Sequence, residues 1–304
     1  MKGFKIVIFF LSSISGFSQD IQTLVDSDFS IRDFITHNDS IIFLKKRNIY
    51  LTETKTGTQH NYFIGGYGLK FYLDDESNTI ISGSNELERN VSSVRFYDIN
   101  KSSVTNTYYN KESRLLDFLV VPEKEFFVAS LIENKIIFID YSKKPMFTKI
   151  IEIKLNAFCR KLVYIKDSLY FVTDKGEFFS YNLATNEQQL IYKDEELVTD
   201  FLIQEQDLIY SSLKGVIIRY NLLTRQKQKI NLSDDFITHL ALYNNDRLIC
   251  GSWKGNIYKI EKHKFSIQLS MPIHSGPVFK IIEQEKGVFL SSSLDATIKK
   301  WQLN

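Results

Sequence analysis

The chain of 304 residues carries 38 Lys and Arg against 36 Asp and Glu, and 43% of its residues are hydrophobic. Its 24 Phe and 16 Tyr supply the buriable surface of a folded globular protein, which excludes a disordered chain. A net charge of +2 is too small to indicate nucleic acid or an acidic membrane surface as the partner.

The first segment has the layout of a cleaved export signal. Lys2 and Lys5 precede the apolar run 6–11, and the small residues Gly16 and Ser18 occupy the −3 and −1 positions of a cleavage site. The apolar run is too short to cross about 30 Å of hydrocarbon, so it does not predict a membrane anchor. We therefore expect a signal peptide over residues 1–18, cleavage near Ser18, export to the periplasm or the exterior, and no membrane insertion.

A pair of short apolar strands joined by a tight polar turn recurs along the rest of the chain. The second strand of each pair ends at position 52, 97, 139, 181, 220, 260 or 301, so the copies are 39–45 residues apart. A period near 40 in an all-strand chain is typical of a β-propeller. Residues 19–304 hold seven such repeats of about 41 residues. The sequence thus predicts one all-β domain, a seven-bladed propeller of four-stranded blades.

Closure of this ring follows from where the repeats start and stop. The last repeat reaches Trp301 with three strands, and the chain ends at Asn304. The segment 21–25 near the other end is the one available to supply the fourth, outer strand. Such an N-to-C strand clasp removes an open sheet edge.

The last repeat contains His274 before Gly276-Pro277, a Ser-rich strand at 291–293, Asp295, and Trp301. This order resembles a WD40 repeat, although Ile273 replaces the Gly before the His and Gln302 replaces the Asp after the Trp. The other six repeats share only the period and the turn–strand pattern. The resemblance implies a structural tetrad that ties the strands of this blade together, formed by His274, Ser292, Asp295 and Trp301. A Ser-His-Asp hydrolytic triad is the alternative interpretation, and no Gly-x-Ser-x-Gly elbow supports it.

Polar residues recur at one position near the start of the innermost strands, which line the channel of a propeller. Alignment of the repeats predicts a ring made of Asp33, Asp117, Arg160, Asp200, His239 and Lys280, with Lys70 near the same position in the second repeat. Two interpretations stay open: charges that compensate one another, or a polar site for a partner or small ligand.

Apolar residues recur in the turns between the second and third strands of the last repeats. Leu213, Trp253 and Leu294 stand there, at a position that WD40 domains commonly use to contact partners. Exposed Trp and Leu at a rim suit a protein-binding hot spot, and packing against a neighbouring blade is the alternative.

Cysteine and histidine usage predicts neither a disulfide nor a metal centre. Cys159 and Cys250 fall in non-adjacent repeats, so we expect two buried free thiols. The five His are scattered singly, and no cofactor motif is visible.

These patterns favour a non-enzymatic, exported protein–protein interaction scaffold that is a monomer on its own and binds no nucleic acid. The alternatives are a hydrolase- or lactonase-like propeller enzyme, a small-ligand binder at the channel mouth and, less well supported, a quinone-dependent dehydrogenase.

Overall fold

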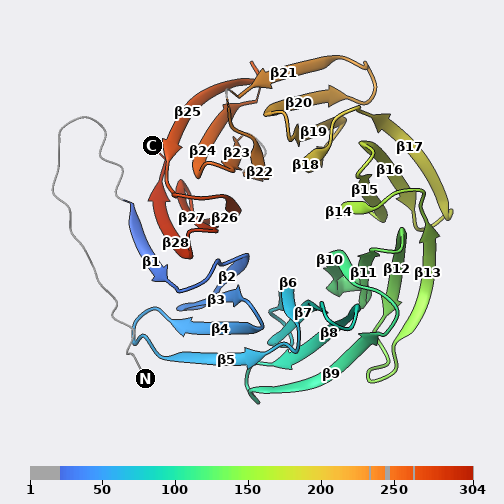
Figure 1. The fold of residues 1–304 in the computed structure, drawn as a ribbon, viewed down its shortest axis with the longest axis vertical. Helices are drawn as coiled ribbons and strands as arrows, with labels where there is room; N and C mark the ends of the chain where they lie inside the picture. The colour runs from blue at the N-terminus through green and yellow to red at the C-terminus, as the bar shows by residue number, and fades with distance from the viewer. Residues whose placement is uncertain (1–20, 233, 244–246, 263, 304) are drawn as a thin grey trace.

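The computed structural model describes residues 21–303, apart from 233, 244–246 and 263, so the predicted signal peptide lies outside the described residues. Seven four-stranded antiparallel sheets surround a common centre (Figure 1). This confirms the predicted seven-bladed propeller. The seven repeat positions 52, 97, 139, 181, 220, 260 and 301 each lie in the third strand of a blade.

Each blade runs from an inner to an outer strand in chain order. Blade 1 is β2 (Asp33–His37), β3 (Ser40–Lys45), β4 (Asn48–Glu53) and β5 (Gln59–Phe63). Blade 2 is β6 (Tyr67–Asp74), β7 (Thr79–Glu86), β8 (Val91–Asp98) and β9 (Ser103–Asn110). Blade 3 is β10 (Leu115–Val121), β11 (Phe126–Leu131), β12 (Lys135–Asp140) and β13 (Thr148–Lys154), with a 3-10 turn at Pro122–Lys124.

The remaining blades follow the same order. Blade 4 is β14 (Cys159–Ile165), β15 (Ser168–Thr173), β16 (Glu177–Asn182) and β17 (Glu187–Lys193). Blade 5 is β18 (Val198–Gln204), β19 (Asp207–Ser212), β20 (Val216–Asn221) and β21 (Lys227–Asn231). Blade 6 is β22 (Ile237–Tyr243), β23 (Arg247–Ser252), β24 (Asn256–Glu261) and β25 (Ser266–Pro272). Blade 7 is β26 (Val278–Glu285), β27 (Val288–Ser293) and β28 (Thr297–Gln302), completed by β1 (Gln22–Asp26).

The outer strand of blade 7 comes from the start of the described chain. Gln22 pairs with Lys300, and Asp26 pairs with Thr297, in an antiparallel register with a bulge between Thr23 and Val25. This confirms the predicted clasp. Strands from the two ends of the described chain therefore lie in one sheet, so separation of β1 from β28 opens the ring.

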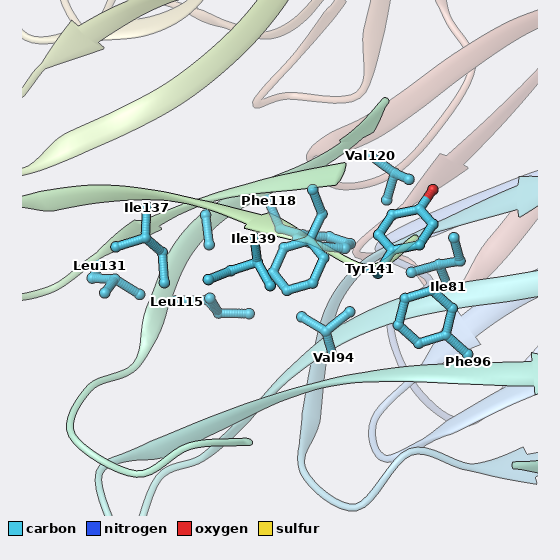
Figure 2. Packing of buried hydrophobic residues seen from close by; sticks show 12 residues of the cluster. Ile81, Val94, Phe96, Leu115, Phe118, Val120, Leu131, Ile137, Ile139 and Tyr141 are labelled. Carbon is cyan, nitrogen blue, oxygen red and sulfur yellow. The ribbon is translucent and has the colours of Figure 1, made fainter. Parts of the chain in front are cut away.

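Alternation along the inner strands separates the core from the channel. On each inner strand, one side chain that points between the blades is apolar and at most 6% exposed. These residues are Phe34, Phe71, Phe118, Leu162, Phe201, Leu240 and Ile281. Figure 2 shows one such interface, where Phe96 and Ile81 of blade 2 lie near Phe118 and Val120 of blade 3. Burial of each large apolar side chain contributes about 1.5–3 kcal/mol, so the interfaces between blades hold the ring together.

Two further findings concern cysteines and membrane spans. Cys159 and Cys250 are free and buried, in blades 4 and 6, as the sequence predicted. Within the described part of the chain, no helix has the length and apolar character needed to cross a membrane.

Candidate functional site

A bulge near the start of the inner strand sets the channel position in six blades. In these blades the inner strand pairs with the second strand, and the pairing skips one residue of the inner strand. The skip lies between Leu115 and Asp117 in blade 3 and between Val278 and Lys280 in blade 7, for example. The residue after the shift is polar in each of these six blades. Blade 1 has no such shift, and its polar residue is Asp33, the first residue of β2. These seven residues are here called the channel ring: Asp33, Lys70, Asp117, Lys161, Asp200, His239 and Lys280.

The channel ring differs from the alignment at one position, in blade 4. The alignment started this inner strand at Phe158 and therefore placed Arg160 in the ring. In the structure Phe158 is 38% exposed, while Cys159 is fully buried as the first strand residue. The shift then falls between Cys159 and Lys161. Lys161 occupies the ring, and exposed Arg160 is the bulged residue.

Acids and bases alternate along the ring from blade 1 to blade 5, and blades 6 and 7 contribute His239 and Lys280. Lys280 of blade 7 contacts Asp33 of blade 1 at 2.6 Å, Lys70 of blade 2 contacts Asp117 of blade 3, and Lys161 of blade 4 contacts Asp200 of blade 5 at 2.7 Å. Each pair therefore crosses a blade interface.

The second oxygen of each ring carboxylate bonds the blade that follows. The backbone N–H of Phe71 donates to Asp33 at 2.9 Å, that of Leu162 to Asp117 at 2.7 Å, and that of Leu240 to Asp200 at 2.8 Å. These three residues follow the ring residue of their own blade. Each Asp thus links the blade before it to the blade after it.

His239 is the ring residue of blade 6, and its Nδ1 lies 3.7 Å from Asp200 Oδ2 of blade 5. The hydroxyl of the neighbouring Thr238 donates to Val278 O of blade 7 at 2.5 Å. Burial lowers the pKa of His239 to about 4, despite the opposing carboxylate of Asp200, so the imidazole is neutral at pH 7. Ring residues therefore bridge six of the seven blade interfaces, and Thr238 bridges the interface between blades 6 and 7.

The charged state of the ring follows from these contacts. Burial alone would raise the pKa of Asp200, but Lys161 and the other donors outweigh it and lower the pKa. Burial alone would lower the pKa of Lys70, but the carboxylates of Asp117 and Asp33 raise it. Both groups remain ionised near pH 7.

A buried hydrogen-bonded chain runs through blade 7. His274 Nδ1 lies 2.9 Å from Asp295 Oδ2, and His274 Nε2 lies 2.8 Å from Ser291 Oγ. The Trp301 indole N–H donates to the same Ser291 oxygen at 2.9 Å. Consistent donor roles place the imidazole proton on Nδ1, with the Ser291 hydroxyl donating to Nε2. This chain ties the loop before β26 to β27, to β28 and to the turn between them.

The tetrad serine is Ser291 and not Ser292, which the sequence analysis named. Ser291 lies two residues from Phe289, whose ring stacks on Trp301 at 4.7 Å. Successive strand side chains point to opposite faces. Ser292 therefore faces away from Trp301, and its hydroxyl has no hydrogen-bond partner among the described residues.

The same contacts have the connectivity of a Ser-His-Asp triad, but the nucleophile position is closed. Ser291 is fully buried, His274 is 6% exposed, and the Ser291 oxygen accepts from Trp301. Burial alone would raise the pKa of Asp295, but hydrogen bonds from His274 and Thr297 hold it well below its usual range. The geometry suits a structural tie.

Blade 6 makes a comparable tie with other residues, which the sequence analysis missed. Asp235 is 6% exposed in the loop before β22 and accepts from the Lys254 backbone N–H at 3.1 Å, the Asn256 amide at 3.1 Å and the Tyr258 hydroxyl at 3.0 Å. The carboxylate takes over the tie from another position of the loop, because Asp235 lies two residues before β22, whereas His274 lies four residues before β26.

The apolar turn residues lie on one face of the propeller. This face, here called the entry face, carries the loops that lead into the inner strands and the turns between second and third strands. The backbone N–H of the turn residue donates to its loop in blade after blade: Leu213 to Leu197 at 3.0 Å, Trp253 to Phe236 at 2.9 Å and Leu294 to Pro277 at 2.9 Å. The side chains of these three turn residues are 49–51% exposed.

Further apolar side chains on the entry face extend this set across blades 5, 6, 7, 1 and 2. The set is here called the apolar arc: Leu213, Trp253, Leu294, Phe29, Phe63, Tyr67 and Leu87, each 42–57% exposed. The loop with Phe29 is anchored beside the Leu294 turn, because Ser27 N–H donates to Ala296 O at 3.0 Å. The Trp253 ring stacks on Phe236 of its own blade at 5.2 Å and does not tuck under a neighbouring blade.

Comparisons with known proteins support the fold. No family model matches the chain, and no curated protein matches its sequence. A crystal structure of the computationally designed Ika8 protein is similar, with a TM-score of 0.69 and 12% sequence identity over 92% of this chain and 98% of that chain. At this identity the likeness concerns the fold alone. The described residues hold no group of three or more His, Cys, Asp or Glu placed to bind a metal ion.

Proposed function

We propose that the chain is an exported, WD40-like propeller that acts as a non-enzymatic protein–protein interaction scaffold. The observation that carries this proposal is the apolar arc. Seven half-exposed apolar side chains gather on one face of five neighbouring blades. Exposed apolar patches of this kind mark interaction sites.

Contacts within each blade hold members of the apolar arc in place, which favours a preorganised binding surface. The turns are hydrogen-bonded to the loops of the same blade, and Trp253 is stacked on Phe236. A rigid aromatic side chain loses little conformational freedom on binding, which favours Trp253 as the central contact. The opposite face, as far as the structure describes it, exposes Met146 and Leu223 among large apolar residues.

The channel ring fits the scaffold interpretation better than an active site. Its carboxylates are 3–7% exposed and are each engaged by a Lys and a backbone N–H. A catalytic acid or base needs a lone pair or proton directed at a substrate. The ring Asp residues direct theirs at the blade interfaces.

Photo-crosslinking in the native host tests the proposal. A photoreactive phenylalanine analogue at position 253 is expected to give a discrete crosslink to one protein, because Trp253 is an aromatic member of the arc and is 51% exposed. The same analogue at position 223, where Leu223 is 72% exposed on the opposite face, is the matched control. Equal crosslinking from both positions, or none from position 253, contradicts the proposal.

Once that protein is purified, Trp253→Ala is expected to weaken its binding by about 2 kcal/mol, while Leu223→Ala leaves the affinity unchanged. Isothermal titration calorimetry measures both values. An unchanged affinity for Trp253→Ala would remove this residue from the contact surface.

A further inference from the structure

Two bases lie against aromatic members of the apolar arc. The Lys46 ammonium is 2.9 Å from the centre of the Phe29 ring, and the Arg47 guanidinium is 4.9 Å from the centre of the Tyr67 ring. Phe29 is 42% exposed and Tyr67 is 46% exposed. A partner that packs on these rings therefore meets two positive charges at the same place.

A third base, Arg95 of β8, lies beside the arc residue Phe63. Its guanidinium donates to the Phe63 backbone oxygen at 3.4 Å. The same guanidinium packs so closely on Gly65 that a Cβ atom at this position would collide with it. Glycine at position 65 therefore leaves room for the Arg95 head beside Phe63. The three bases are here called the arc bases: Lys46, Arg47 and Arg95.

The arc bases have no carboxylate within ion-pair distance among the described residues, because the neighbouring acids are engaged by other bases. Asp28 pairs with Lys45, and Glu86 pairs with Arg89 at 3.8 Å. Bonds from a guanidinium or an ammonium to a carboxylate are among the strong hydrogen bonds of proteins. The arc bases can therefore accept carboxylates from outside the chain.

The two ends of the apolar arc differ in charge. On the entry face, the segments that connect strands in blades 1 and 2 hold four bases and two acids, whereas those of blades 5 and 6 hold five acids and two bases. The first set is 27–32, 46–47, 64–66 and 87–90, and the second is 194–197, 213–215, 232–236 and 253–255. A uniform polyanion such as nucleic acid is repelled at the second end. A protein segment can place its acids at the first end alone.

We propose that the entry face over blades 1 and 2 binds an acidic segment of the partner protein. Its carboxylates bond the arc bases, and an apolar anchor packs on Phe29, Phe63 and Tyr67. This inference rests on the proposed scaffold function and names the chemistry of the contact segment. The acids of blades 5 and 6 repel the same segment, so complementary charge also sets its position on the arc.

Photo-crosslinking from position 67 tests the proposal. The photoreactive phenylalanine analogue in place of Tyr67 is expected to capture the same protein as at position 253, through a peptide rich in Asp and Glu that mass spectrometry identifies. A crosslink from position 253 without one from position 67, a captured peptide without acids, or captured nucleic acid would overturn the proposal. No crosslink from position 253 would refute the scaffold function, and this proposal with it.

Charge reversal locates the contact, with calorimetry of the purified partner as the measurement. Lys46→Glu with Arg47→Glu is expected to weaken binding at least tenfold. Lys143→Glu with Lys229→Glu reverses two exposed bases outside the entry face and is expected to leave the affinity unchanged. Exchange of the acids in the captured peptide for Lys should restore binding to the first variant. Equal affinities of the two double variants, or no restoration, would overturn the proposal and leave the scaffold function standing.

Discussion

Replacement of one ring carboxylate should cost the propeller far more than replacement of a surface carboxylate. In Asp117→Asn the neutral amide can still accept from the Leu162 N–H, which now lies 2.7 Å from the carboxylate, but it no longer compensates the charge of Lys70. Asp117 is 2% exposed, so its interactions are not screened as surface pairs are.

The magnitude follows from the environment of Lys70. Removal of one partner from a fully buried pair costs about 3–5 kcal/mol, and a hydrogen bond to a charged group contributes about 1.5–3 kcal/mol. The Lys70 side chain is 32% exposed and can recover part of its hydration. We therefore expect a loss of about 2–3 kcal/mol, and a Tm lower by about 5 °C for a chain of this size.

Urea denaturation and thermal melts measure this loss against a matched control. Asp39 forms an ion pair with Lys55 at 2.6 Å, but both side chains are at least 68% exposed. Asp39→Asn should therefore change stability little. The double variant with Lys70→Met should recover part of the loss, because it removes the uncompensated charge. If Asp117→Asn and Asp39→Asn lose stability equally, the ring does not hold the blades together.

Three further predictions concern blade 7, the imidazole of the ring and the clasp. Ser291→Ala should lose about 2 kcal/mol in urea denaturation because His274 and Trp301 lose their shared partner, whereas Ser292→Ala should be close to neutral; the reverse order would refute the tetrad assignment. The pKa of His239 is about 4 in the folded protein and about 6.5 unfolded, so its stabilising contribution is complete above pH 6.5 and is lost as the pH falls toward 4. Between pH 7 and pH 5, wild type should lose about 1–2 kcal/mol more stability than His239→Gln. An equal change in the urea midpoints of wild type and His239→Gln would contradict this. Deletion of residues 19–26 exposes the edge of β28, so we expect aggregation in size-exclusion chromatography, and a monomer with unchanged Tm would contradict the clasp.

The fold could be predicted because each repeat is determined by residues that are close together in the sequence. Turn chemistry between short apolar strands, such as Lys214-Gly215, needs only neighbouring residues, and Gly215 has a φ of 74° that favours glycine. The position of the clasp followed by counting strands. Both features depend on periodicity and not on any long-range contact.

The errors at Arg160 and Ser292 both concern one residue of register. A β-bulge adds one residue to a strand, and the side-chain direction reverses with each step. The bulge in blade 4 starts at buried Cys159, a small residue, whereas the larger Phe158 beside it is exposed. Size and hydrophobicity therefore pointed to the wrong starting residue.

The pairing within the ring lay beyond the sequence for a different reason. Lys70 and Asp117 are 47 residues apart, and Lys280 and Asp33 are 247 residues apart. Their contact depends on the rotation from one blade to the next, which no local pattern encodes. The sequence predicted acids and bases at one level of the channel, but it did not predict which carboxylate each base contacts.

The most direct test of the scaffold function is native mass spectrometry of the protein, gently purified from its own host, as wild type and as Trp253→Ala. We predict a stoichiometric complex with one other protein for wild type, and a mass shift to the free chain for Trp253→Ala. A complex that survives Trp253→Ala, or a bare monomer in both samples, would contradict a protein partner bound through the apolar arc.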